Sequence, residues 1–200
     1  EIQMGFHRAG KLWGLANFKV VPDIVVFGKA LTNGLNPLSG IWAKEELINP
    51  KVFPVGSTHS TFSSNTLGTA VGLELMKMIE EQNYEKKVTE KGKSFLARLK
   101  ALQKKYPRVI GDVDGLGLAL RMEIVQKDGY APDRELADKI FAEGMKGDLK
   151  GKNGKRIGLV LDVGGYYKNV FTIAPSFTIT ETEMDLAMEL FKSLIRKCSN

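Results

Sequence analysis

Apolar residues follow three patterns along this chain: short continuous runs, helical spacing and strict alternation. The run Ile24–Phe27 is continuously apolar, with Pro22 and Asp23 before it and a Gly/Asn/Pro-rich stretch behind it. A run of this length between turn signals is typical of a strand buried on both faces, as in parallel sheets that helices cover. A second short apolar run, 38–43, follows, and residues 44–47 predict a brief helix that ends near Pro50.

Apolar residues at helical spacing predict four longer helices. One follows the hydroxyl-rich loop 57–66, one spans about 84–106, and the others span 133–145 and 180–196. The sequence Thr180-Glu181-Thr182-Glu183 predicts a capping box at the start of the last helix. We expect the apolar positions to face a core; they are, in chain order, Leu67, Val71, Leu75, Met76, Met78 and Ile79; Val88, Phe95, Leu96, Leu99 and Leu102; Leu136, Ile140, Phe141 and Met145; and Met184, Ala187, Met188, Phe191, Leu194 and Ile195.

Strict alternation begins beyond Pro107, where the chain changes to short β-like runs. Residues 113–124 predict one half-buried strand, and further strands are expected near 157–161 and 170–174. The Gly-rich basic stretch 146–156 has no aromatic residues that could stack on bases, so we expect a solvated loop and no nucleic-acid partner. We therefore divide the chain into residues 1–83 and residues 84–200, the latter a connecting helix and a small α+β domain.

Composition excludes several classes of protein. Of the 200 residues, 43% are apolar and 26% are charged, which is typical of a folded chain and not of a disordered one. The only cysteine, Cys198, allows no internal disulfide and no cysteine-based metal site, and it indicates a reducing compartment, the cytoplasm. His7 and His59, the only histidines, have no further ligands nearby in the sequence, so we expect no metal and place His7 in an exposed turn. No apolar run approaches the ~20 residues that cross a bilayer, and we expect no membrane span.

Lys29 stands directly beyond the buried run, where open α/β sheets place their ligand sites. An amine at the end of a buried strand loses hydration, which favours its neutral, nucleophilic form. The net charge of +6 also suits a phosphate-bearing ligand. The alternative is that Lys29 is an ordinary solvated lysine, and that the loop 57–66 merely caps the helix behind it.

Three segments together resemble the class III aminotransferases, of the ornithine or 4-aminobutyrate type, which use pyridoxal phosphate (PLP). Residues 1–13 resemble the family's Asp-Glu-(Val/Ile)-Gln-Thr-Gly-Phe-Gly-Arg-Thr-Gly-Lys stretch without its first Asp. Residues 22–37 are similar to the strand and loop that present the family's Schiff-base lysine. Residues 59–68 resemble its His-Gly-Ser-Thr-(Phe/Tyr)-Gly-Gly-Asn-Pro-Leu loop. The order and separation of the three segments make the resemblance specific.

The resemblance implies an aspartate-aminotransferase-like α/β fold (PLP fold type I). Residues 1–83 would be the C-terminal part of the large PLP-binding domain, and residues 84–200 the connecting helix and the small C-terminal α+β domain. The implied function is transamination of an amino acid, ω-amine or diamine to a keto acid; a mutase or epimerase of the same family is an alternative.

The resemblance also implies roles for individual residues. Lys29 would form the Schiff base with PLP and move protons, and Gln3 would bind the phenolic oxygen of PLP, with Ile2 under the ring. Ser60 and Thr61 would reach a cofactor phosphate, in this family that of the neighbouring subunit, so a homodimer with shared active sites is implied.

Departures from the family pattern limit what the resemblance implies. Thr172 stands where the family has an arginine that commonly serves substrate carboxylate recognition, and a hydroxyl cannot form a bidentate carboxylate clamp. We therefore expect a donor that is not held through a carboxylate at this point.

The start of the chain also departs from the family pattern. The family's Asp before Glu1 and the upstream half are absent, and Glu1 is no initiator methionine, so we expect part of a longer parent. The competing hypothesis is a truncated, non-catalytic piece that folds or dimerises without cofactor.

Overall fold

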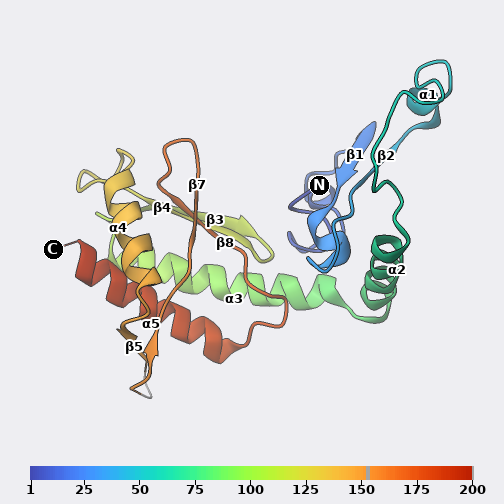
Figure 1. Ribbon diagram of the computed structural model, residues 1–200. Coiled ribbons are helices and arrows are strands. Elements are labelled where there is room, and N and C mark those ends of the chain that lie inside the picture. Colours follow the sequence, from blue (N-terminus) through green and yellow to red (C-terminus); the bar gives the residue numbers. More distant parts are fainter. Residues whose placement is uncertain (152–153, 200) are drawn as a thin grey trace. The chain divides into compact units, whose positions relative to one another are not determined.

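The computed structural model describes residues 1–151 and 154–199, and the chain divides into two compact units, Glu1–Lys87 and Val88 onward (Figure 1). The first unit contains the short 3-10 helices η1 (Gly14–Phe18) and η2 (Lys29–Thr32), the strands β1 (Ile24–Phe27) and β2 (Gly40–Ala43), and the helices α1 (Glu45–Ile48) and α2 (Thr66–Glu81). Helix α3 (Tyr84–Lys105) begins in the first unit and continues in the second. The second unit then contains β3 (Ile110–Leu116), β4 (Ala119–Ile124), α4 (Arg134–Met145), β5 (Leu149–Lys150), β6 (Arg156–Ile157), β7 (Asp162–Gly164), β8 (Val170–Ile173) and α5 (Glu181–Cys198).

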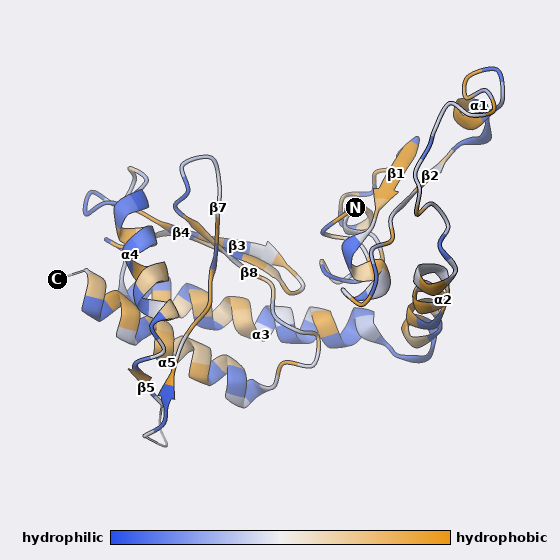
Figure 2. Cartoon of the chain, in the orientation of Figure 1, coloured by the Kyte–Doolittle hydropathy of each residue, from blue (hydrophilic) through white to orange (hydrophobic). Residues whose placement is uncertain are grey.

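The predicted strand 24–27 is present as β1, and Figure 2 shows it as apolar along its length. It pairs antiparallel with β2, and the side chain of Val25 is buried whereas Ile24 and Val26 are 51% and 42% exposed. The expectation of a parallel-sheet strand buried on both faces is therefore wrong for the part of the chain that the structure describes. An apolar run does not specify the direction of pairing, and a two-stranded ribbon has too few neighbours to cover both of its faces.

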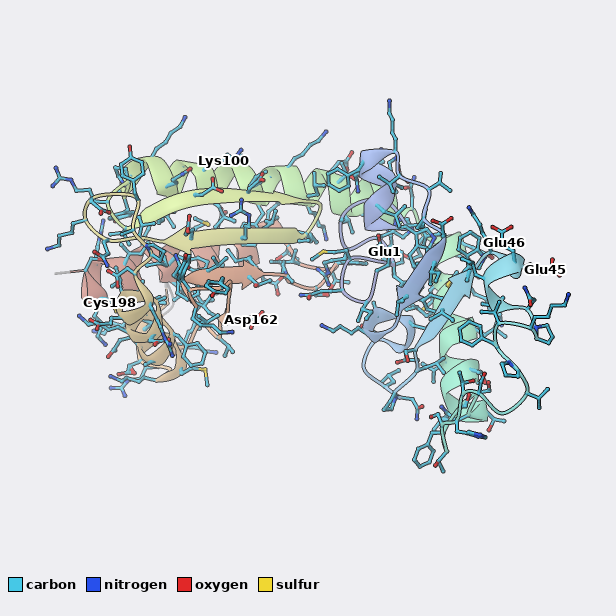
Figure 3. All side chains as sticks on the ribbon, turned by 90° about the horizontal axis from the view of Figure 1, so that it is seen from above. Glu1, Glu45, Glu46, Lys100, Asp162 and Cys198 are labelled. Carbon is cyan, nitrogen blue, oxygen red and sulfur yellow. The ribbon has the colours of Figure 1, made fainter. Side chains whose placement is uncertain are left out.

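Aromatic packing holds the N-terminal segment against the carboxyl end of β1. The ring of Phe6 lies edge-on to Phe27, with centroids 6.3 Å apart, and Trp13 lies 6.0 Å from the same ring. The carboxylate of Glu1, labelled in Figure 3, accepts hydrogen bonds from the amides of Gly14 and Leu15 at 2.9 and 2.8 Å. These contacts fix residues 1–15 beside the strand that leads to Lys29.

The second unit is built on an antiparallel sheet in the order β3-β4-β8-β7. The sequence predicts one strand over 113–124, but the structure has a hairpin in which Leu116 pairs with Ala119. The intervening turn has two residues, so apolar and polar positions stay in phase across it, and Gly117 supplies the positive φ that the turn needs. The alternating pattern was therefore correct, but the turn within it was not predicted.

The strand predicted near 157–161 is shorter than expected and has a partner that was not predicted. It consists of β6 alone, which pairs with β5, so the predicted solvated loop 146–156 is in part a β-ribbon; its residues 152 and 153 lie outside the described residues. Strand β7 was not predicted, because it has only three residues, ends at the first of two neighbouring glycines and carries little pattern. Strand β8 confirms the prediction near 170–174.

Three of the predicted helices pack on one face of this sheet with their apolar sides. Asp133 caps α4, because its carboxylate accepts the amide of Leu136 at 2.9 Å. The predicted capping box of α5 is present: the amide of Glu183 bonds to Thr180 Oγ1, and the amide of Thr180 bonds to the Glu183 carboxylate. The fully buried centre of this core is formed by Phe95, Leu99 and Leu102 of α3, Leu120, Met122 and Ile124 of β4, Ile140 of α4, Phe171 of β8, and Met184, Phe191 and Leu194 of α5, with Cys198 at its edge.

Helix α2 is present as predicted, but its buried face is not the one we expected. Leu67 and Met78 are 63% and 41% exposed, and Met76 is only half-buried. The buried positions are Gly68 and Gly72, because this side of α2 packs closely on η2. Apolar periodicity alone does not find a contact made by glycines.

Candidate functional site

Lys29 is the first residue of η2 and follows β1 after Gly28, as the sequence predicts. Its φ of +43° lies in the left-handed region, which is unfavourable for a residue with a β-carbon. The side chain is exposed, and we find no hydrogen-bond or ion-pair partner for it within residues 1–151 and 154–199. The desolvated surroundings expected for this lysine are thus missing from these two ranges, whereas strained backbone at a reactive side chain is a common property of functional sites.

The turn after Lys29 is closed by its own hydrogen bonds. The amide of Leu31 bonds to the carbonyl of Gly28 at 3.0 Å, and the amide of Leu35 bonds to the carbonyl of Thr32 at 3.0 Å. Thr32 is 2% exposed, and its hydroxyl donates a hydrogen bond to the carbonyl of Asn36. The lysine is therefore presented by a compact turn and not by a loose loop.

Gln3 lies in the segment that packs against the end of β1. Its side chain is exposed, and so is that of Ile2, at 49%. Because Phe6 contacts Phe27, and Phe27 lies two residues before Lys29, this segment and the lysine turn adjoin the same end of one strand. The structure therefore brings the segments of Gln3 and Lys29 to the same end of β1.

Ser60 and Thr61 lie in the hydroxyl-rich loop that leads to α2. Both are exposed, and neither hydroxyl has a partner in the ranges that the structure covers. The start of α2 is capped by Asn65, whose side-chain oxygen accepts the amide of Gly68 at 2.6 Å. Because α2 packs on η2, this loop enters a helix that directly contacts the lysine turn.

The chemistry of these groups fits a carbonyl cofactor that carries a phosphate. Lys29 offers a primary amine, Gln3 an amide donor, and the loop ahead of α2 two free hydroxyls and the positive end of a helix dipole. All of these groups belong to the first unit. The set includes the nucleophile and the anion donors that such a cofactor requires.

His7 differs from the expected exposed turn histidine. It is 8% exposed with φ of +67°, and its Nδ1 lies 3.1 Å from the carbonyl oxygen of Gly10. The histidine ring lies beside that of Tyr84, with centroids 6.5 Å apart, and its chain neighbour Phe6 packs on Trp13. Among the described residues no group of three or more potential metal ligands was found.

Thr172 lies in the second unit, in a row of polar residues that crosses the whole sheet. Asp114 of β3, Arg121 of β4, Thr172 of β8 and Asp162 of β7 stand opposite one another in register. The guanidinium of Arg121 bonds to Asp112 Oδ2 at 2.7 Å and lies 3.9 Å from Asp114 Oδ2. An arginine therefore adjoins Thr172, but two aspartates already neutralise it.

Sequence reasoning missed Arg121 and Thr32. Arg121 becomes a neighbour of Thr172 only through the register of β4 and β8. The two residues are 51 positions apart in the sequence, and no spacing rule specifies this register. Thr32 was read as part of a turn-rich stretch, and its sequence carried no signal that its hydroxyl closes the turn.

The sequence of this chain is similar to those of known enzymes. The family described as Aminotransferase class-III matches residues 1–195. An ornithine aminotransferase of Oceanobacillus iheyensis is 34% identical over 98% of this chain, and an alanine/serine racemase of Pyrococcus horikoshii is 31% identical over 98%. The chain covers 42% and 38% of these two proteins, so it spans about two fifths of the length of the curated relatives it matches.

Solved structures agree with the sequence comparison. A transaminase from the marine bacterium Virgibacillus superimposes with a TM-score of 0.84 at 25% identity, over 99% of this chain and 44% of its own. An (S)-enantioselective omega-transaminase of Thermomicrobium roseum gives a TM-score of 0.83 at 26% identity, over 100% of this chain and 43% of its own. The aspartate-aminotransferase-like fold expected from the sequence is thereby confirmed.

Proposed function

This chain belongs to the class III aminotransferases, and from that premise we propose that its full-length parent transfers an amino group from an amino acid, ω-amine or diamine to a keto acid, with PLP attached to Lys29. The observation that carries the proposal is Lys29 itself: an unpaired amine in a left-handed turn directly beyond the end of β1. The enzyme class of the family supports the reaction, and the turn supports this lysine as the attachment point.

The residues of this chain have defined tasks in such a reaction. When bound, PLP withdraws electrons from the carbon that carries the transferred amine. The Nζ atom of Lys29 would be the covalent attachment point of the cofactor and, once the substrate amine had released it, would carry a proton to and from the substrate carbon. Its exposure and freedom from ion pairs leave the amine able to swing between these two positions.

Gln3, Ser60 and Thr61 would orient the cofactor. The amide of Gln3 would donate a hydrogen bond to the phenolic oxygen, and Ile2 would lie against the ring. The hydroxyls of Ser60 and Thr61 would donate to a phosphate. We propose that this phosphate belongs to the neighbouring subunit of a homodimer, and that the protein acts in the cytoplasm, as the single cysteine suggests.

The first experiment tests whether PLP is attached to Lys29. The full-length protein is treated with PLP and borohydride, and the modified peptide is mapped by mass spectrometry. A phosphopyridoxyl group on Lys29, lost in Lys29→Ala, supports the proposal. Lys19→Ala is a matched control, because Lys19 is also exposed and also has a positive φ, of +56°. Equal labelling of Lys19 and Lys29 would contradict the proposal.

Racemisation is the second candidate, because an alanine/serine racemase is among the relatives. Both reactions would use Lys29 to remove a proton, but a racemase returns it to the same substrate carbon. Dependence on a keto acid separates the two: a transaminase needs a keto acid for continuous turnover, whereas a racemase interconverts enantiomers of an amino acid without one.

The competing hypothesis is that these 200 residues fold without cofactor as a non-catalytic module. An intact mass of 22.1 kDa for the natural protein, with no adduct on Lys29, would support it. A mass well above this value, with the adduct, would support the enzyme.

A further inference from the structure

The turn that presents Lys29 is held in an unfavourable conformation. Lys29 has a φ of +43° and the turn ends at Asn33 with a φ of +50°, so both ends are left-handed although neither is a glycine. An isolated turn would relax from this state, because a β-carbon disfavours it. Some neighbouring contact must therefore maintain the conformation.

One such contact is the buried hydroxyl of Thr32. It donates its hydrogen bond to the carbonyl of Asn36, while its own carbonyl accepts the amide of Leu35 at 3.0 Å. Both bonds close the chain from residue 32 to residue 36 into a ring. Because Thr32 is 2% exposed, water cannot easily replace the hydroxyl as a donor.

A second contact presses this ring against the first turn of α2. A β-carbon built on Gly68 would lie 2.8 Å from Asn36 Oδ1 and 2.8 Å from Asn65 Oδ1, so both asparagine side chains lie over this glycine. One turn further, a β-carbon on Gly72 would lie 3.4 Å from Leu38 and 3.6 Å from Leu31, which are ordinary packing distances. The close approach is therefore specific to Gly68.

The geometry points to Thr32 and Gly68 as positioning residues for Lys29: together they clamp the lysine turn on the helix that begins after the Ser60–Thr61 loop. The clamp joins the segment that carries the amine to the segment that carries the hydroxyls. It would thus fix the amine toward the cofactor of its own subunit relative to the hydroxyls, which would reach the phosphate of the neighbouring subunit's cofactor. This inference rests on the proposed attachment of PLP to Lys29.

Thr32→Val tests the hydroxyl in the full-length protein. Valine keeps the shape but cannot donate, so we expect the rate of borohydride-trapped PLP attachment at Lys29 to fall roughly tenfold. We also expect a shift in the pH midpoint of the absorbance change that accompanies attachment. Thr32→Ser restores the donor and should restore both. Thr69→Val is the control: it removes an exposed hydroxyl of α2, which bonds to the carbonyls of Asn65 and Thr66.

Gly68→Ala and Gly72→Ala form a matched pair one helical turn apart. Both gain the same helix propensity, but only the methyl group at 68 meets the Asn36 and Asn65 amides. We expect Gly68→Ala to slow attachment at Lys29 and to increase hydrogen exchange in the peptide 28–38, and Gly72→Ala to change neither. Circular dichroism and thermal unfolding verify that each variant is folded.

The outcomes separate the two proposals. If the wild type is trapped at Lys29 and all variants match it in rate, pH midpoint and exchange, the positioning role is wrong and the proposed function stands. If the wild type gives no adduct at Lys29, the proposed function fails and the positioning role fails with it. Slower trapping in Thr32→Val and Gly68→Ala, with normal Thr32→Ser and Gly72→Ala, supports the clamp.

Discussion

The sheet of the second unit has one apolar face, which packs on the core, and one polar face. Leu120 and Met122 of β4 face the core, while Arg121 between them faces outward with Asp112 and Asp114. Thr172 lies beside Arg121 in this polar row and is half-buried. A substitution at Thr172 therefore changes the charge of the outward face without entering the core.

If the proposed function holds, and position 172 has the carboxylate-recognition role that the resemblance gives it, Thr172→Arg should add activity toward a dicarboxylate donor such as glutamate. Arg121 is held by two aspartates and is not free to bind a substrate carboxylate. A second guanidinium beside it could bind that carboxylate, so we expect kcat/KM for glutamate to rise by roughly tenfold or more. The new arginine would lie directly opposite Arg121 on the neighbouring strand, and this pair of like charges should lower the free energy of unfolding by about 0.2–1 kcal/mol. Steady-state kinetics with glutamate and with a diamine measure the effect. Thr172→Met, which is larger than threonine and uncharged, is the control; equal glutamate activity in all three proteins would contradict a role for this position.

Glu143 is the clearest single-residue source of pH dependence. Hydrogen bonds from Lys146 and Lys197 lower its pKa from 4.5 to about 2. A carboxyl group whose pKa is depressed by folding stabilises the protein above its unfolded value and loses this effect as pH falls toward its folded value. We expect Glu143→Gln to lower the melting temperature at neutral pH, and the difference from wild type to shrink between pH 4.5 and 2. Glu135→Gln, which alters a carboxylate in the same helix, is the control. A constant difference across this range would contradict the assignment.

Among the elements, α3 shows why one helix can carry a glycine in its interior. A β-carbon on Gly92 would lie 2.0 Å from the carbonyl oxygen of Gly117, in the turn between β3 and β4. Backbone cannot move aside as a side-chain end can, so the helix and the hairpin approach each other only because this position is glycine.

Gly92→Ala should therefore destabilise the second unit by about 1–3 kcal/mol, net of up to about 1 kcal/mol gained in helix propensity. Chemical denaturation measures the change. Lys100→Ala, at an exposed position of the same helix (Figure 3), should stay within about 0.5 kcal/mol of wild type. If the two substitutions lower the free energy of unfolding equally, the close approach of α3 to the turn at Gly117 does not require a glycine at position 92.

The elements also show what sequence reasoning can reach. Helices α3, α4 and α5 were predicted because each has one apolar face whose residues recur within a few positions of one another, and α5 also has a capping box at its start. The turn at Gly117 and the strand β7 were not, because pairing between distant strands decides them. The candidate site followed the same division: Lys29, Gln3, Ser60 and Thr61 have motif neighbours, whereas the proposed clamp at Thr32 and the register of Arg121 depend on contacts between distant parts of the sequence.

At the scale of the whole molecule, the two units differ in how much apolar surface they bury. In the first unit the structure shows only Phe6, Ala9 and Val25 as buried apolar side chains, while Ile24, Val26, Ile41 and Trp42 of its ribbon are exposed. The contiguous core lies in the second unit.

None of the helices in the described ranges is long and apolar enough to span a membrane.

We expect residues 84–200 to fold alone and residues 1–83 not to. The first piece contains the complete core and the whole of α3, whereas the second leaves apolar ribbon faces to water and should self-associate. Cooperative thermal unfolding and dispersed amide resonances would show the folded piece; binding of a hydrophobic dye and concentration-dependent light scattering would show the other. A monomeric, cooperatively unfolding piece 1–83 would contradict this expectation.

The buried Cys198 gives the molecule a natural reporter. It is 4% exposed in the last turn of α5, and burial raises the pKa of its thiol, so a thiol reagent reacts only when this turn opens. Because the chain has no other cysteine, the rate of labelling follows a single site. The same measurement can thus time the opening of the C-terminal helix in any variant without an engineered label.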